Sequence, residues 1–171
     1  MIHLYYGEGK GKTTAAAGQA LRAAGNGMKV VFTQFLKGSV SGEINILKNI
    51  EGIVILRNDR DMGFLNSMSG EEIKQITEIH NNNFRKSIEL IYGGKYDMLV
   101  LDEICAAYEM GVIDLKSVES FISSKPNQAE IILTGRNPAD IFMESADYIT
   151  EMCKIRHPFD KNVQARRGIE Y

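Results

Sequence analysis

Residues 5–14 read YYGEGKGKTT, a glycine-rich stretch between the apolar run Ile2–Tyr6 and the alanine-rich run Lys12–Ala24. The two runs predict a strand and a helix, and a glycine loop between such elements is the setting of a phosphate-binding loop. Backbone N–H groups and the positive end of the helix can hold phosphates, Lys12 can reach the terminal phosphates, and the Thr13 hydroxyl can ligate Mg²⁺. The stretch therefore predicts a nucleotide-binding α/β fold.

The loop departs from the usual pattern G-x-x-x-x-G-K-[ST] at one position, because Tyr6 stands where the first glycine is expected. Gly7 and Gly9 are therefore expected to supply the turn. A glycine-rich turn with an accidental Lys-Thr is the alternative, and the flanking strand and helix favour phosphate binding over it. The residues predicted to bind the nucleotide are Gly7, Glu8, Gly9, Lys10, Gly11, Lys12, Thr13 and Thr14.

Length and composition narrow the class of protein. A chain of 171 residues is long enough for one buried core and short for two, so residues 1–171 are expected to form a single nucleotide-binding domain. A net charge of −2 gives no bulk electrostatic reason to bind nucleic acid or an anionic membrane. No apolar run approaches the roughly 20 residues of a membrane span.

Cysteine use and the start of the chain bear on the compartment. Cys105 and Cys153 are far apart and form no C-x-x-C pair, which suits a reducing compartment and gives neither a disulfide framework nor a zinc site. The chain opens on a strand and its loop, without the pattern of a secretion signal. We therefore expect a cytoplasmic protein.

Apolar runs and helical patterns alternate along the chain. The expected helices lie at about Gly42 to Asn49, from Ser69 to Gly93, and near Cys105 and Val118. The further expected strands are Val30–Phe35, Ile53–Leu56, Met98–Leu101 and Ile131–Leu133. The alternation predicts an α/β fold with a mostly parallel sheet, whose ligand loops gather at the carboxyl ends of the strands.

Charged residues follow two of these strands. Asp102 and Glu103 come directly after Met98–Leu101 and resemble a Walker B motif, which would hold Mg²⁺ together with the Thr13 hydroxyl and phosphate oxygens. The alternative is that the two acids cap the next helix. Arg136 follows Ile131–Leu133 and could pair with phosphates or carboxylates, or could be a surface arginine in a turn.

Other polar residues give weaker indications. At the end of Val30–Phe35, Phe35 is expected in the core and Lys37 in solvent. His3, His80 and His157 share no metal-ligand spacing, and His80 is expected simply to lie on a helix face. The C-terminal segment is locally basic and could be a solvated tail or a clamp for an anionic ligand.

These motifs leave three chemistries open: ATP hydrolysis, phosphoryl transfer, and a reaction with triphosphate as leaving group. The order of the segments resembles the ATP:corrinoid adenosyltransferase family over nearly the whole chain. Its missing loop glycine is shared by that family. The segments are residues 6–14, Gln34-Phe35-Leu36-Lys37-Gly38, Gly42-Glu43, Gly63-Phe64, Val100-Leu101-Asp102-Glu103, Ile132-Leu133-Thr134-Gly135-Arg136, His157-Pro158-Phe159-Asp160 and Gly168-Ile169-Glu170-Tyr171.

The resemblance implies a RecA-like P-loop NTPase fold in three layers, with MgATP and a reduced corrinoid as substrates. It implies that Co(I) attacks the ribose C5′ and expels triphosphate, in the biosynthesis or salvage of adenosylcobalamin. Reduced cobalt requires an electron-donating reductase, and a homodimer is compatible with the family. The competing reading is a small P-loop ATPase or kinase, in which Glu103 would polarise water or a substrate hydroxyl and Arg136 would stabilise the transferring phosphate.

The resemblance also implies a role for each site residue. Lys12 and Thr13 would contact phosphate and metal, Glu103 and Asp102 would hold Mg²⁺, and Arg136 would lie near the nucleotide or the corrinoid. Phe64 matches an aromatic residue that helps to keep the lower axial ligand off cobalt. Lys12, Glu103 and Phe64 are thus the residues expected to serve catalysis. Two positions after Phe64, this chain has asparagine where some relatives have tryptophan.

Overall fold

A six-stranded sheet forms the centre of the protein, in the order β3-β2-β4-β5-β1-β6. The computed structural model describes residues 1–38, 41–58, 68–124, 126 and 128–170. All pairings between the strands of these residues are parallel. The strands are β1 (Ile2–Tyr6), β2 (Val30–Gln34), β3 (Ile53–Arg57), β4 (Met98–Asp102), β5 (Glu130–Gly135) and β6 (Tyr148–Glu151).

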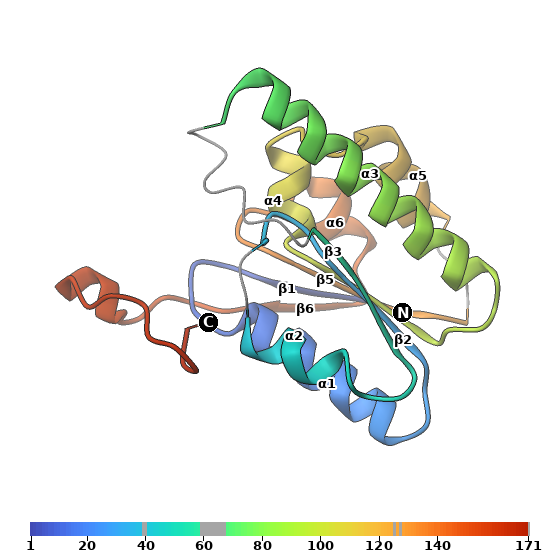
Figure 1. Cartoon of the computed structure of the whole chain (residues 1–171), viewed down its shortest axis with the longest axis horizontal. Helices are drawn as coiled ribbons and strands as arrows, with labels where there is room; N and C mark the ends of the chain where they lie inside the picture. Colours follow the sequence, from blue (N-terminus) through green and yellow to red (C-terminus); the bar gives the residue numbers. More distant parts are fainter. Residues whose placement is uncertain (39–40, 59–67, 125, 127, 171) are drawn as a thin grey trace.

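Helices cover both faces of the sheet and make three layers (Figure 1). On one face lie α1 (Lys12–Gly25) and α2 (Gly42–Leu47). On the other lie α3 (Gly70–Tyr92), α4 (Ile104–Glu109), α5 (Leu115–Ser123) and α6 (Asp140–Ser145). Two clusters of buried apolar side chains fill the spaces between the layers. The predicted three-layer α/β fold is confirmed, and the sheet is wholly rather than mostly parallel among the described strands.

Local sequence explains the main elements. Every residue of β2 and β4 is buried, as expected for short apolar strands covered by helices on both faces. Small side chains at Ala16 and Ala20, both 0% exposed, let α1 pack closely on the sheet. At the start of α3, the Glu72 N–H donates to Ser69 Oγ and the Ser69 N–H donates to Glu72 Oε2, which is the expected capping box.

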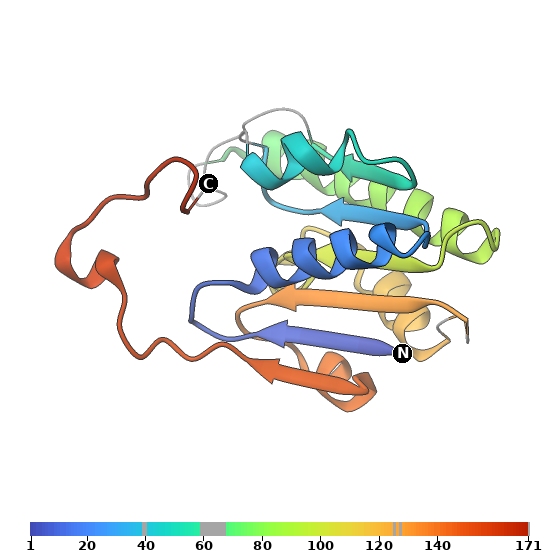
Figure 2. The ribbon, with the colours of Figure 1, turned by 90° about the horizontal axis from the view of Figure 1, so that it is seen from below.

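The end of the chain was not predicted in the same detail. Neither α6 nor β6 was expected. β6 gave no signal in the sequence because it is an exposed edge strand without a buried apolar run. After β6 the chain extends away from the sheet, forms the short 3₁₀ helix η2 (Pro158–Lys161), and returns toward the carboxyl ends of the strands (Figure 2). Among the described helices, none has both the length and the apolar character needed to cross a membrane.

Candidate nucleotide-binding site

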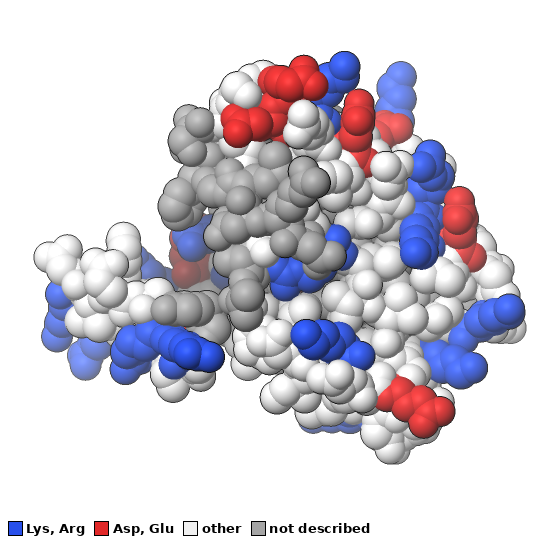
Figure 3. All heavy atoms as spheres, viewed as in Figure 1, with Lys and Arg blue, Asp and Glu red and all other residues white. Residues whose placement is uncertain are grey.

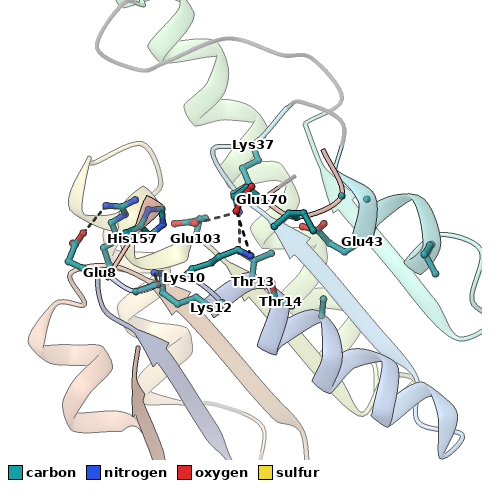
Figure 4. Close-up of a pocket in the computed structure, with 18 residues that line it drawn as sticks. Glu8, Lys10, Lys12, Thr13, Thr14, Lys37, Glu43, Glu103, His157 and Glu170 are labelled. Carbon is teal, nitrogen blue, oxygen red and sulfur yellow. Dashed lines mark hydrogen bonds and ion pairs between the residues drawn. The ribbon is translucent and has the colours of Figure 1, made fainter. Parts of the chain in front are cut away.

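A cleft of about 590 Å³ opens at the carboxyl ends of the strands, where the glycine loop meets the residues that follow β2, β4 and β5 (Figure 4). Charged side chains form much of its lining, and it lies where parallel α/β sheets bind their ligands. Its lining residues are Glu8, Gly9, Lys10, Gly11, Lys12, Thr13, Thr14, Ala17, Lys37, Gly42, Glu43, Ile46, Glu103, Arg136, His157, Gly168, Ile169 and Glu170. The predicted loop residues 8–14 all line this cleft, whereas Gly7 lies beside it.

The glycines of the loop have distinct structural roles. Gly7 and Gly11 have φ angles of 108° and 118°, a left-handed conformation that favours glycine. Gly9 is needed for a different reason, because a Cβ there would lie 2.5 Å from the Met152 carbonyl oxygen. The Gly9 N–H donates to that oxygen at 2.5 Å, and the Gly7 N–H donates to the Arg136 carbonyl at 3.2 Å. The loop is therefore attached to the segments that follow β5 and β6.

Lys12 lies inside the loop, with its side chain folded over the glycines. Its ammonium group donates to the Gly7 carbonyl at 2.6 Å and to the Gly9 carbonyl at 2.8 Å, and the residue is 9% exposed. Burial is the main cause that lowers the pKa of Lys12. The loop thus holds a largely desolvated cation at the point where a phosphate would enter.

Asp102, at the end of β4, is a fully buried carboxylate with three side-chain donors. Its Oδ1 accepts from the Thr13 hydroxyl at 2.9 Å and from the Thr134 hydroxyl at 2.7 Å, and its Oδ2 accepts from Gln34 Nε2 at 3.0 Å. These donors come from α1, β5 and β2, so one carboxylate joins the loop to both strands that neighbour β4. A buried charge needs such compensation.

Glu103 occupies the left-handed region with φ 62°, a strained conformation for a residue other than glycine. Its N–H donates to Thr134 Oγ1 at 2.9 Å, and its side chain faces the cleft rather than the helix that follows (Figure 4). It stands at the N-cap position of α4 but makes no side-chain capping bond. The interpretation of Asp102 and Glu103 as helix caps is therefore wrong.

Lys37 contributes a second cation to the site. Its Nζ lies 3.0 Å from Thr13 Oγ1 and 3.5 Å from both Asp102 Oδ2 and Glu103 Oε1. Burial, the largest single effect, lowers the pKa of Lys37, but the carboxylates of Asp102, Glu103 and Glu43 together raise it above its ordinary value. The expectation that Lys37 is merely solvated is wrong, because its side chain reaches back over the end of β4.

His80, on α3, holds the backbone that leads to Lys37. It is 1% exposed; its Nε2 lies 3.2 Å from the Leu36 N–H, and its Nδ1 lies 2.9 Å from the Val112 carbonyl. Since an N–H can only donate, Nε2 is the acceptor and Nδ1 carries the proton. Leu36 has φ 60° and the Lys37 N–H donates to the Phe35 carbonyl at 2.7 Å, which closes a tight γ-turn. His80 does lie on a helix face, but on the buried one.

The rim of the cleft carries Arg136, which lies opposite Glu8. Arg136 Nη1 donates to Glu8 Oε2 at 2.8 Å, and both side chains are more than half exposed. Basic side chains also gather on the C-terminal segment (Figure 3). Within the described part of that segment, however, the residues that line the cleft are His157, Gly168, Ile169 and Glu170. The segment thus brings an imidazole and a carboxylate to the cleft rather than its lysines and arginines.

A family model described as "ATP:corrinoid adenosyltransferase BtuR/CobO/CobP" matches residues 1–171. The chain belongs to this family. Corrinoid adenosyltransferases from a Sinorhizobium species and from Escherichia coli K12 are each 33% identical to it over its whole length, and the matches cover 80% and 85% of those proteins. The corrinoid adenosyltransferase CobA of Salmonella typhimurium is 32% identical over all of this chain and 85% of its own length.

Solved structures support the fold at much lower identity. A KaiC-like protein from Pyrococcus horikoshii has a TM-score of 0.52 and 15% identity over 98% of this chain and 74% of its own. EssC ATPase domains from Geobacillus thermodenitrificans also reach a TM-score of 0.52, with 11% identity over 98% of this chain and 34% of theirs. Both similarities support the predicted α/β fold with a parallel sheet. As a member of the adenosyltransferase family, the protein is an enzyme whose substrates are ATP and a corrinoid.

The structure adds three residues to the site that were not among the predicted site residues, and one of them, Lys37, was expected in solvent. Gln34 and Thr134 are donors to Asp102, and Lys37 faces the carboxylates. The sequence feature that could have identified them is their position at strand ends, within segments that resemble the adenosyltransferases. Phe64, the residue expected beside the corrinoid, lies outside the described residues, as do Gly63 and Asn66.

Proposed function

We propose that this adenosyltransferase transfers the 5′-deoxyadenosyl group of ATP to the Co(I) of a reduced corrinoid and releases triphosphate intact, in cobalamin biosynthesis or salvage. The family match over residues 1–171 carries the proposal. The cleft supports it, because the phosphate-binding loop, Glu103 and Arg136 border one cavity. A small ATPase or kinase is not favoured, since the relatives named above are corrinoid adenosyltransferases.

The reaction needs orientation and charge stabilisation rather than a general base. The new cobalt–carbon bond takes its two electrons from Co(I), and the C5′–O bond gives its electron pair to the departing triphosphate. Charge therefore grows on the triphosphate as it leaves. Lys12 and the N–H groups at the start of α1 would stabilise that charge, which is why Lys12 is proposed as a catalytic residue.

Mg²⁺ is proposed as the cofactor, held by Thr13, Asp102 and Glu103. The donor set fits, because Mg²⁺ prefers carboxylate, hydroxyl and phosphate oxygens. The buried Gln34 Oε1 beside Asp102 has no hydrogen-bond partner among the residues that the structure describes, which leaves a further oxygen close to this group. Among the described residues, no three His, Cys, Asp or Glu side chains gather as a metal site, so phosphate oxygens would complete the coordination. When bound, the ion supplies positive charge to the triphosphate.

Arg136 is proposed to leave Glu8 and contact the nucleotide or the corrinoid, since the pair lies exposed at the rim. Phe64 is proposed to help displace the lower axial ligand of cobalt. An electron-donating reductase is required because the reaction consumes Co(I). We further propose that residues 1–171 act as one domain in the cytoplasm, as the single sheet and the unpaired cysteines suggest. A homodimer is compatible with the family resemblance.

The test is a product assay that follows both halves of the reaction. ATP, Mg²⁺ and a chemically reduced corrinoid are expected to give a light-sensitive cobalt–carbon product and one triphosphate for each alkylated cobalt. Release of ADP and phosphate without cobalt alkylation would refute the proposal and favour the ATPase reading.

A further inference from the structure

The Lys37 ammonium group contacts the same three side chains that are proposed to hold Mg²⁺. Its Nζ lies 3.0 Å from Thr13 Oγ1 and 3.5 Å from Glu103 Oε1 (Figure 4). It also lies 3.5 Å from Asp102 Oδ2. Two carboxylates from the end of β4 and a hydroxyl from α1 thus surround one positive charge. Without that charge, the fully buried Asp102 and its neighbour Glu103 would repel each other across a partly desolvated site.

The orientation of the Thr13 hydroxyl matches a cation at this position. Its proton points to Asp102 Oδ1 at 2.9 Å, so its lone pairs are the part that can face Lys37. An ammonium group has donors and no acceptor, so Lys37 must meet those lone pairs. A metal ion would need the same lone pairs on Thr13. Lys37 and a metal ion would therefore compete for one set of oxygen atoms.

The backbone before Lys37 is built for this contact. The γ-turn at Leu36 reverses the chain directly after β2, and its left-handed residue is strained. The Leu36 N–H is held by the buried His80, and the Phe35 N–H donates to the Asp102 carbonyl at 3.0 Å. A strained turn with two such anchors places the lysine side chain beside β4 rather than in solvent.

We propose that Lys37 is a built-in substitute for the divalent cation. In the nucleotide-free enzyme its ammonium group holds Thr13, Asp102 and Glu103 together, and it must leave when the metal enters with ATP. Once the ammonium group has gone, Thr13, Asp102 and Glu103 would hold the ion, which would supply positive charge to the triphosphate. The inference rests on the proposed magnesium site, and it adds that the free enzyme excludes the metal until nucleotide arrives.

The test uses nucleotide-free protein and Mn²⁺ alone as the probe, followed by electron paramagnetic resonance. Lys37→Gln is expected to bind Mn²⁺ about tenfold more tightly than the unaltered protein, because one competing charge is removed. Adding Glu103→Gln to that variant should abolish the gain. Lys86→Gln removes the same charge from an exposed position of α3 and should leave Mn²⁺ affinity within about twofold. Equal Mn²⁺ affinity in Lys37→Gln and the unaltered protein would overturn the inference.

A second measurement covers the case in which Lys37→Gln folds poorly. The unaltered protein should show a protected ¹⁵N ammonium signal for Lys37, assigned by its loss in Lys37→Arg, and the signal should vanish into solvent exchange when MgATP binds. A signal that persists with MgATP bound would also overturn the inference. If MgATP does not bind at all, the proposed function fails, whereas the Mn²⁺ result still decides the role of Lys37.

Discussion

Replacing His80 tests how the buried imidazole stabilises the turn before Lys37. In His80→Phe, the Leu36 N–H and the Val112 carbonyl both lose their partner, and each unpaired buried group costs about 1–3 kcal/mol. Because the Leu36 N–H bond is only partly buried, the free energy of unfolding should fall by about 2–5 kcal/mol, somewhat less than twice the upper cost of one buried group. His80→Gln can donate to one partner and accept from the other, so its loss should be about 1 kcal/mol.

The same residue predicts a pH dependence. Burial is the main cause that lowers the pKa of His80 below its ordinary value of 6.5. As the pH falls below that value, the unfolded chain gains a proton that the folded protein does not, so stability is lost on the acid side. The slope can reach about 1.4 kcal/mol per pH unit for one such proton. At higher pH both states have neutral His80, and the dependence disappears.

Urea unfolding of the unaltered protein, His80→Phe and His80→Gln at a series of pH values checks both effects. His80→Gln should lose less stability than His80→Phe and should flatten the acid limb of the stability curve. Two results would refute the reasoning: equal losses in the two variants at high pH, or an acid limb in His80→Gln as steep as in the unaltered protein.

The other predictions concern the loop and the corrinoid. Lys12→Ala should weaken MgATP binding by about 10–100-fold in calorimetry while the far-UV spectrum stays unchanged, and equal affinity would contradict its phosphate contact. Gly9→Ala should lower the melting temperature and ATP affinity because its Cβ would meet the Met152 carbonyl, whereas Gly18→Ala, with open space around it, should not. Phe64→Ala should slow the reaction more with corrinoids that carry a lower nucleotide loop than with those that lack one, and equal slowing would remove Phe64 from that role.

Much of the fold follows from local sequence. The glycine loop and the apolar run that ends at Asp102 carry strong patterns, since one must turn around an anion and the other must be buried on both faces. β6 has no such pattern, because an edge strand whose residues are all exposed needs no continuous apolar run. Its pairing with β1 is set by the path of the chain after β5, which residues 148–151 do not encode by themselves.

The cleft was predictable only in part, for a related reason. Thr13 and Asp102 belong to known local motifs, but the position of Lys37 depends on β2 lying next to β4 in the sheet, with Gln34 opposite Asp102. That strand order is a tertiary property. His80 shows the same limit, since its partners Leu36 and Val112 are distant in the sequence and contribute only backbone groups. A pattern in side-chain types cannot signal such bonds.

The hydrogen bonds of the glycine loop divide it into two parts with different functions. The N–H groups of Gly7 and Gly9 already donate to Arg136 and Met152, so these two donors are used inside the protein rather than on an anion. The glycine-rich half is thus held by the segments that follow β5 and β6, the two strands on either side of β1. Anion contacts fall to the helical half, at Lys12 and the first turn of α1. The enzyme should therefore bind one end of the triphosphate tightly, whereas the other residues that line the cleft position the rest of the nucleotide.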